Sequence, residues 1–466
     1  MPKKKVIVIG SGIGGSGVAA LLQHSGEFDV DLFEKNGLIG GRFASHWKDG
    51  FRLDIGCHLI ANCDKGTLGE ILNIVGEPDA VKWRYAQRPS PVFNYKGERV
   101  RFPHEIHKLG FSNEELEKIM QFFAETNGIP EDQWDASDQK NMLDQLERYV
   151  QNDRARIIFG ILSGVYFVIP DFETPVGEWV RCNRDFTEKR SSGYPIGGTG
   201  AIPEAYVENL QKNGGRVHLS TPIKRISIDD GKAVGVETRG GDLHEADLVI
   251  SNAGLKPTIN HLVGRERYGA KTLEQVDAYE YSEATYMVKV ALDVPFVENE
   301  NMVMFMGCDD QAVLQAELDN GAVPEVASHA MIPIVSNLDP SAAPEGKQLI
   351  IIGGGANRQS LDSTREDWDK WEHAFLNALE VVFPGVKEHI LWTETTSPTD
   401  INNLFGEDGC VIGIGQKVGQ VGENRPSMED PSIGNLYHCS ADTGMHGIGG
   451  ELAADSALRL YRTLKS

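Results

Sequence analysis

The stretch that decides the fold is residues 5–15, Lys5-Val-Ile-Val-Ile-Gly10-Ser-Gly12-Ile-Gly14-Gly15. Residues 5–9 form a short apolar run, which is typical of a buried parallel strand. Residues 14–23 are small and apolar enough to form a helix packed on that strand. Residues 29–34, with alternating polarity, predict a second strand. This order predicts a βαβ unit that opens a doubly wound α/β sheet.

Glycines at 10, 12 and 15 form the pattern G-x-G-x-x-G. Gly10 allows the tight strand-to-helix turn, Gly12 lets the backbone approach a pyrophosphate, and Gly15 lets the helix pack close to the strand. The N–H groups at the start of the helix would then face the phosphates. Glu34, at the end of the second strand, can accept both hydroxyls of an adenosine ribose. The pattern therefore predicts a dinucleotide site, which could take NAD or FAD.

Composition argues against a nucleic-acid partner and indicates the general class of the protein. The 466 residues include 45 Lys+Arg and 68 Asp+Glu, a net charge of -23, whereas nucleic acid needs clustered basic residues. The length predicts two or three domains. Six scattered cysteines without a C-x-x-C pair indicate reduced thiols in a cytoplasmic protein, with no metal site and no disulfide framework. The apolar run before Gly10 is too short for a secretory signal.

The middle of the chain has a different character. Residues 90–103 predict a hairpin that turns at Lys96-Gly97, and Ser112 with Glu115 predicts a capping box. Residues 155–169 are almost wholly apolar and too short to span a bilayer. They are expected to form a buried helix or strand, the wall of an apolar substrate tunnel, or a lip that touches a membrane. Residues 353–355, three glycines, are interpreted as a turn.

A second glycine-rich motif follows Glu34. Gly40-Gly41-Arg42, Gly50-Phe51 and Asp54-Ile-Gly56-Cys-His58 together resemble a motif of the flavin amine oxidase and phytoene desaturase superfamily. The resemblance implies that the glycines contact the flavin's ribityl chain and pyrophosphate, and that Arg42 lies near the phosphates. NAD dehydrogenases do not need this motif, so FAD is the expected dinucleotide, bound without a covalent link.

The C-terminal segment 435–451 resembles the C-terminal flavin motif of the same superfamily. By that resemblance Asp442 reaches the ribityl chain or phosphates, and the turn 447–449 leads a helix toward the isoalloxazine. Ala441 stands where the family often has Gly, and Asp442 could instead be a simple helix cap. Ile223 matches the strand whose backbone meets adenine. The expected cofactor-binding residues are Gly10, Gly12, Ile13, Gly14, Gly15, Glu34, Lys35, Gly41, Arg42, Ile223, Asp442, Gly447, Ile448 and Gly449.

The resemblance implies an α/β fold with a Rossmann-type FAD-binding domain and a discontinuous substrate domain of mixed sheet plus helices. Residues 1–79, 191–260 and 400–466 are expected to form the FAD-binding domain. Residues 80–190 and 261–399 are expected to form the substrate domain. The pattern of α/β segments at both ends and in the middle of the chain favours this division.

The resemblance also implies a flavin oxidoreductase. The tail lacks the aromatic residue usual in amine oxidases, and the segment Gly197-Gly198-Thr-Gly200 resembles the phytoene desaturase branch. We therefore expect hydride transfer between flavin N5 and a carbon–carbon bond of an apolar, isoprenoid or carotenoid-like substrate, in a desaturase or saturase. An amine oxidase-type enzyme and a non-redox FAD-dependent isomerase stay open as alternatives.

Three residues are catalytic candidates. His58 and His446 fall close to the expected flavin ring, where an imidazole can orient substrate or move a proton. Each could instead only order a loop. Arg425 could stabilise reduced, anionic flavin or contact substrate. An electron acceptor or donor is required, peripheral membrane contact is possible in principle through an apolar patch, and no transmembrane segment is expected.

Overall fold

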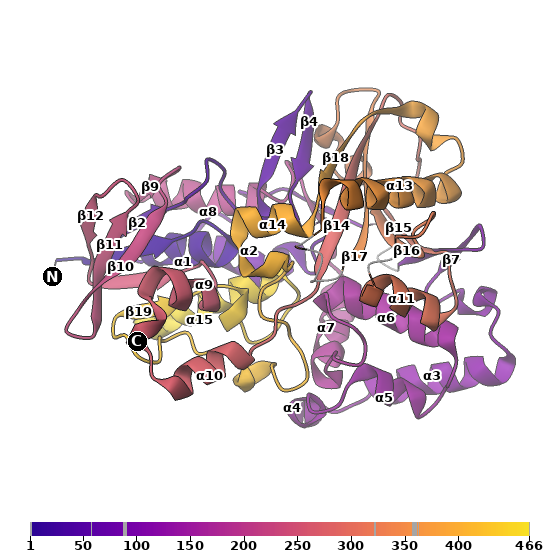
Figure 1. Cartoon of the computed structure of the whole chain (residues 1–466), viewed down its shortest axis with the longest axis horizontal. Helices are drawn as coiled ribbons and strands as arrows, with labels where there is room; N and C mark the ends of the chain where they lie inside the picture. The colour runs from indigo at the N-terminus through magenta and orange to yellow at the C-terminus, as the bar shows by residue number, and fades with distance from the viewer. Residues whose placement is uncertain are drawn as a thin grey trace.

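The computed structural model describes residues 2–56, 58–86, 91–320, 323–356, 361 and 363–465. A parallel five-stranded sheet, in the order β19-β13-β1-β2-β9, forms one half of the molecule (Figure 1). Its strands are β1 Lys4–Ile9, β2 Phe28–Phe33, β9 Arg216–His218, β13 Leu248–Ser251 and β19 Leu436–His438. The predicted βαβ opening is confirmed, with α1 (Ile13–His24) between β1 and β2.

Helix α1 is the centre of this half because nearly all its residues are small or apolar and buried. It packs against α8 (Ala201–Lys212) and α15 (Gly450–Lys465), which come from distant parts of the chain. Beside the parallel sheet lies an antiparallel one made of β10 (Ile223–Asp229), β11 (Lys232–Thr238) and β12 (Leu243–Glu245).

The other half is built on a mixed seven-stranded sheet in the order β18-β14-β17-β16-β15-β6-β7. Only the pairing of β15 with β6 is parallel among the pairings described for this sheet. Its strands are β6 Val92–Tyr95, β7 Glu98–Arg101, β14 Ala284–Leu292, β15 Met302–Met306, β16 His329–Pro333, β17 Gln348–Ala356 and β18 Ile390–Thr396. The α/β fold with a mixed second sheet, expected from the sequence, is confirmed.

Two layers of helices cover this sheet. Helix α13 (Arg365–Val382) lies on one side, and α6 (Asp153–Phe167) with α11 (Gln311–Asn320) lies on the other (Figure 1). Successive side chains of a strand point to opposite faces of the sheet, which explains why both faces of β15 are covered. Val303 and Phe305 pack toward α13, whereas Met304 and Met306 pack toward α6. The further helices of the α6 layer are α3 Asn113–Asn127, α4 Trp134–Ser137, α5 Met142–Glu147 and α7 Val176–Lys189.

Several local predictions for this half are confirmed. The hairpin β6–β7 turns at Lys96 and Gly97, which both have positive φ. Ser112 and Glu115 form the predicted capping box of α3. The apolar segment 155–169 is mostly the buried helix α6, and no helix of the described ranges is long and apolar enough to cross a membrane.

The prediction of a turn at 353–355 is wrong, because these glycines lie inside β17 and pair with β14. A Cβ at Gly353 would stand 2.5 Å from the Tyr286 carbonyl oxygen, so the missing side chain permits a close approach of two strands. The glycines also line a cavity, described below, where side chains would take up space.

Nine shorter helices and strands complete the fold in the described ranges. They are α2 Thr67–Ile74, β3 Ser45–Lys48, β4 Phe51–Asp54, β5 Trp83–Tyr85, β8 Gly193–Pro195, α9 Leu255–Pro257, α10 Ala270–Ala278, α12 Val335–Leu338 and α14 Pro398–Phe405. The strands of the parallel sheet come from three separate stretches of chain, and those of the mixed sheet from two. The exact domain boundaries given above stay a prediction.

Candidate functional site

A cavity of about 1620 Å³ extends from the glycine-rich turn to the face of the mixed sheet. Pockets for one small ligand measure about 300–1,000 Å³, so this cavity has room for a cofactor and a substrate together. Its walls come from both halves of the molecule, including β1, β10, α6, β14, β16, β17 and the tail before α15.

The glycine-rich turn is so tightly packed that side chains are excluded. Gly10 has a φ of +95° and donates its N–H to the Phe33 carbonyl at 2.7 Å. A Cβ at Gly12 would lie 2.5 Å from Asn252 Oδ1, and one at Gly15 would lie 2.1 Å from the Gly10 carbonyl oxygen. The predicted role of Gly15 in close packing thus agrees with its neighbours. Gly12 is needed for contact with Asn252 as well as for any approach of a ligand.

The start of α1 is open to the cavity. Gly12, Ile13 and Gly14 line it, and within the described residues no side chain caps the helix and no acidic residue occupies its first turn. N–H groups and the positive end of the helix dipole therefore face a space that an anion can enter. This arrangement fits the pyrophosphate of a dinucleotide.

Glu34 is held beside this turn. Its carboxylate Oε2 accepts hydrogen bonds from the Ser11 N–H at 2.9 Å and the Ser11 hydroxyl at 2.7 Å, and its Oε1 accepts from the Asn36 N–H at 2.9 Å. The side chain is buried but lines the cavity. Sequence reasoning missed Ser11, whose position between two motif glycines was the available signal.

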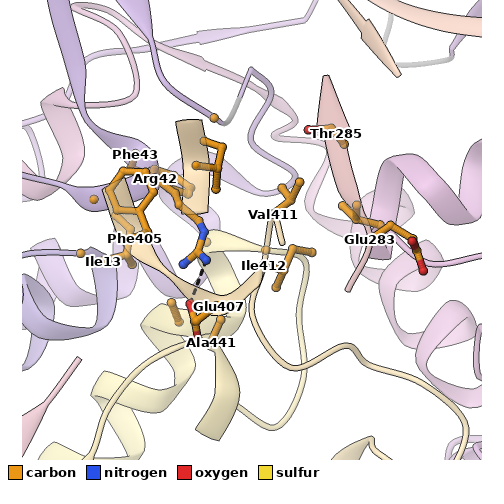
Figure 2. Close-up of a pocket in the computed structure, with 18 of the residues that line it drawn as sticks. Ile13, Arg42, Phe43, Glu283, Thr285, Phe405, Glu407, Val411, Ile412 and Ala441 are labelled. Atoms are coloured by element: carbon orange, nitrogen blue, oxygen red, sulfur yellow. Dashed lines mark hydrogen bonds and ion pairs between the residues drawn. The ribbon is translucent and has the colours of Figure 1, made fainter. Parts of the chain in front are cut away.

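Arg42 faces Glu407 across the cavity wall, and Figure 2 shows the two side chains pointing toward each other. Arg42 Nη2 donates to Glu407 Oε2 at 2.8 Å, and its Nε donates to the Cys410 carbonyl at 3.2 Å. The ring of Phe405 lies 5.5 Å from the guanidinium carbon. The resemblance gave Arg42 a phosphate contact, whereas its partner here is an acid that the sequence did not single out.

Glu407 and Asp442 form an acidic pair next to Arg42. Burial, together with the charge of Asp442, raises the pKa of Glu407 to about 7, and Arg42 opposes this shift. Asp442 accepts hydrogen bonds from the N–H groups of Leu255 and Ile414, each at 2.8 Å. Glu407 Oε1 is buried and has no hydrogen-bond partner among the described residues. The expected ribityl or phosphate ligand Asp442 is thus fixed by the backbone at the cavity wall.

The tail turn before α15 is held by a buried acid from the other half of the molecule. Glu178, on α7, accepts hydrogen bonds from the Gly447 N–H at 2.9 Å and from Gln416 Nε2 at 3.0 Å. Its Oε2 lies 2.7 Å from His446 Nδ1. Burial alone would raise the pKa of Glu178, but His446, Gly447 and Arg181 lower it overall. Glu178 thereby ties the helical layer to the segment expected beside the flavin.

The three catalytic candidates lie in different surroundings. His58 is buried, lines the large cavity and has Nε2 2.9 Å from Met287 Sδ. His446 instead lines a separate hollow of about 250 Å³. Arg425 is buried away from the cavity lining and donates to the carbonyls of Ile414 and Ala441 at 2.9 and 2.7 Å. Burial lowers the pKa of Arg425 to about 10. Their catalytic roles stay predictions, and the geometry favours His58.

Most of the expected cofactor residues share this one cavity. Gly15 and Gly447 do not line it but support residues that do. The residues that line it are Gly10, Gly12, Ile13, Gly14, Glu34, Lys35, Gly41, Arg42, Ile223, Asp442, Ile448 and Gly449. Burial lowers the pKa of Lys35. No cluster of metal-ligating side chains occurs in the part of the chain that the structure describes.

The half of the cavity next to the mixed sheet is mainly apolar. Its lining includes Ile157, Ile161, Val165, Met304, Met331 and Ile351. Tyr166 is the only Tyr or Trp among the described lining residues, so no facing pair of such rings is present there. An apolar chain could gain binding energy here by burying its surface, at about 25 cal/mol per Å².

A parallel sheet, a glycine-rich turn, an open helix N-terminus and an acid at the end of the second strand define a dinucleotide-binding α/β protein. The chain belongs to the family described as flavin containing amine oxidoreductase, whose profile matches residues 18–459. This family implies FAD as the cofactor.

A curated relative and two solved structures agree with this family. The zeta-carotene-forming phytoene desaturase of Myxococcus xanthus is 26% identical over 486 residues, covering 94% of this chain and 90% of the relative. An oxidoreductase from Methanosarcina mazei superposes with a TM-score of 0.78 at 22% identity, over 98% of this chain and 100% of the other. A structure of putrescine oxidase superposes with a TM-score of 0.72 at 14% identity, and the match covers 100% of this chain and 99% of the other. At these identities the two structures support the fold alone. The chain is a phytoene desaturase-like enzyme of the family.

Proposed function

We propose that this protein is an FAD-dependent oxidoreductase that acts on a carbon–carbon bond of an apolar, isoprenoid or carotenoid-like substrate. The observation that carries the proposal is the apolar half of the large cavity, which adjoins the dinucleotide half and has no facing pair of Tyr or Trp among its described lining residues. An amine would gain from a pair of aromatic rings facing its cationic end. A hydrocarbon chain needs buried apolar area instead.

Bound FAD would supply the acceptor or donor of a hydride equivalent. In this proposal the start of α1 holds the pyrophosphate, Glu34 the adenosine ribose, and Asp442 the ribityl chain. We assign to His58 the role of orienting the substrate or moving a proton, because it lies at the cavity wall against Met287. The apolar wall formed by α6 would keep water away from the reacting bond.

The test uses the FAD-loaded protein without oxygen. A C40 polyene or its partly saturated partner is expected to change the flavin absorbance, and product analysis should show a change in the number of double bonds when an external electron acceptor or donor is present. Simple primary amines are expected to leave the flavin unchanged.

Two results would contradict the proposal. Rapid flavin bleaching by a primary amine, with peroxide formed after oxygen is admitted, would favour an amine oxidase. Conversion of a polyene to a geometric isomer, with no need for an acceptor and no net redox change, would favour a non-redox isomerase. The Gly12→Val variant, in which cofactor binding should fail, serves as the control for flavin-dependent turnover.

A further inference from the structure

One cation stands in the apolar wall of the cavity. Arg156 lies near the start of α6 and is the single charged residue between Ala155 and Ile169. It lines the large cavity. Its Nε is buried, and across the described ranges its guanidinium forms no hydrogen bond or ion pair. The Arg156 side chain is half-buried, so its guanidinium loses part of its hydration, and a bound anion would offset that cost.

An acid with a free oxygen accompanies this arginine. Asp171 follows α6, lines the same cavity and is only 4% exposed. One of its oxygens, Oδ1, accepts the Phe172 N–H at 3.0 Å, whereas Oδ2 has no partner among the described residues. Burial raises the pKa of Asp171 to about 6, with the charge of Arg156 acting in the opposite direction. In its protonated form Asp171 can donate a hydrogen bond from the unpartnered Oδ2 into the cavity that Arg156 also lines.

We infer that Arg156 and Asp171 form a subsite for a carboxylate carried at one end of an otherwise apolar substrate chain. The inference rests on the proposed function, which it deepens by adding a polar end to the substrate. A carboxylate is planar and singly charged, which matches one guanidinium fork. A diphosphate would bring more negative charge next to Asp171, which lines the same cavity, than one arginine can balance.

The apolar part of such a substrate has a continuous path. Lining residues follow α6 from Arg156 through Ile161 to Val168, a rise of about 18 Å along a helix. Met304 and Met331 face this path from the mixed sheet. A long chain anchored at Arg156 could therefore extend along α6 into the interior of the cavity.

The test compares two fluorescent probes on the FAD-loaded protein: parinaric acid, a polyene fatty acid, and its methyl ester. Both are used below the concentration at which they form micelles. The wild type should bind the acid at least about tenfold more tightly than the ester, because a charge-assisted hydrogen bond is worth that factor or more. Arg156→Met should abolish this preference and leave the affinity for the ester unchanged.

Two further variants serve as controls. Arg148→Met removes a nearby arginine that bonds Gln145 and does not line the cavity, so the preference should persist. Asp171→Asn can still donate a hydrogen bond and should also retain it. FAD content and the flavin spectrum confirm that each variant is folded.

Equal affinity of the wild type for acid and ester would overturn the subsite while leaving the proposed apolar substrate intact. An acid preference that survives Arg156→Met would overturn it as well. If neither probe binds to FAD-loaded protein, the subsite and the proposed apolar substrate both fail.

Discussion

Glu407→Gln should make the protein more stable in mild base and leave it nearly unchanged in mild acid. Glu407 is buried beside Asp442 and pairs with Arg42, and its pKa rises from the usual 4.5 to about 7. At pH 5 the wild-type side chain is therefore neutral, as glutamine is. At pH 8 it is ionised, despite the cost of its burial and of the neighbouring carboxylate.

The direction in which stability changes with pH follows from where Glu407 binds its proton. Between about pH 4.5 and 7 the folded protein holds this proton and the unfolded chain does not, so stability falls as pH rises through that range. Above pH 7 Glu407 is ionised in the folded protein, which lowers the free energy of unfolding. A rise in pKa of this size corresponds to a loss of about 3 kcal/mol. The Arg42 pairing is already included in the pKa, so the variant should recover up to that amount at pH 8.

The assay is thermal unfolding of the cofactor-free protein at pH 5 and pH 8. The Gln variant should unfold a few degrees higher than the wild type at pH 8, and within error of it at pH 5. Asp408→Asn is the matched control, since Asp408 is adjacent but exposed. The same pH dependence in wild type and Glu407→Gln, or an equal effect in Asp408→Asn, would refute the reasoning.

Four further predictions concern the cofactor. The purified protein should be yellow, and denaturation should release FAD, whereas FMN or flavin left on the chain would contradict the assignment. Glu34→Ala should weaken FAD binding by about 1.5–3 kcal/mol, measured by titration of apoprotein. Gly12→Ala should weaken it too, because a Cβ there collides with its neighbour, while Gly160→Ala, in open space on α6, should not. Glu178→Ala should release the turn at His446 and quicken FAD dissociation, measured by the rate at which flavin leaves the protein, and an unchanged rate would contradict this role of Glu178.

The local part of the site could be predicted from the sequence. The strand, the glycine-rich turn and Glu34 lie within a few tens of residues, and their spacing alone sets the geometry of a βαβ unit. The resemblance then directed attention to Arg42, Asp442 and Ile448, which line the same cavity.

The partners of these residues could not be predicted, because they come from far along the chain. Glu407 is 365 residues from Arg42, and Glu178 is 268 residues from His446. Neither acid belongs to a motif, and only the packing of the two halves brings them together. The glycines at 353–355 could not be assigned from the sequence for a different reason. Three glycines suit either a turn or a close pairing of strands, and only the presence of β14 beside them shows that they form a strand.

The position of β19 in the parallel sheet affects how the protein emerges from the ribosome. β19 pairs with β13, and α15 packs on α1. The first helix therefore completes its packing only after the last helix has been synthesised. At about 5–20 residues per second, roughly 10–40 s separate the synthesis of β13 from that of β19. During this interval the apolar edge of β13 and one face of α1 lack their final cover, so apolar surface stays exposed on the nascent chain. Loading of the dinucleotide would then be a late event, confined to chains translated beyond residue 450.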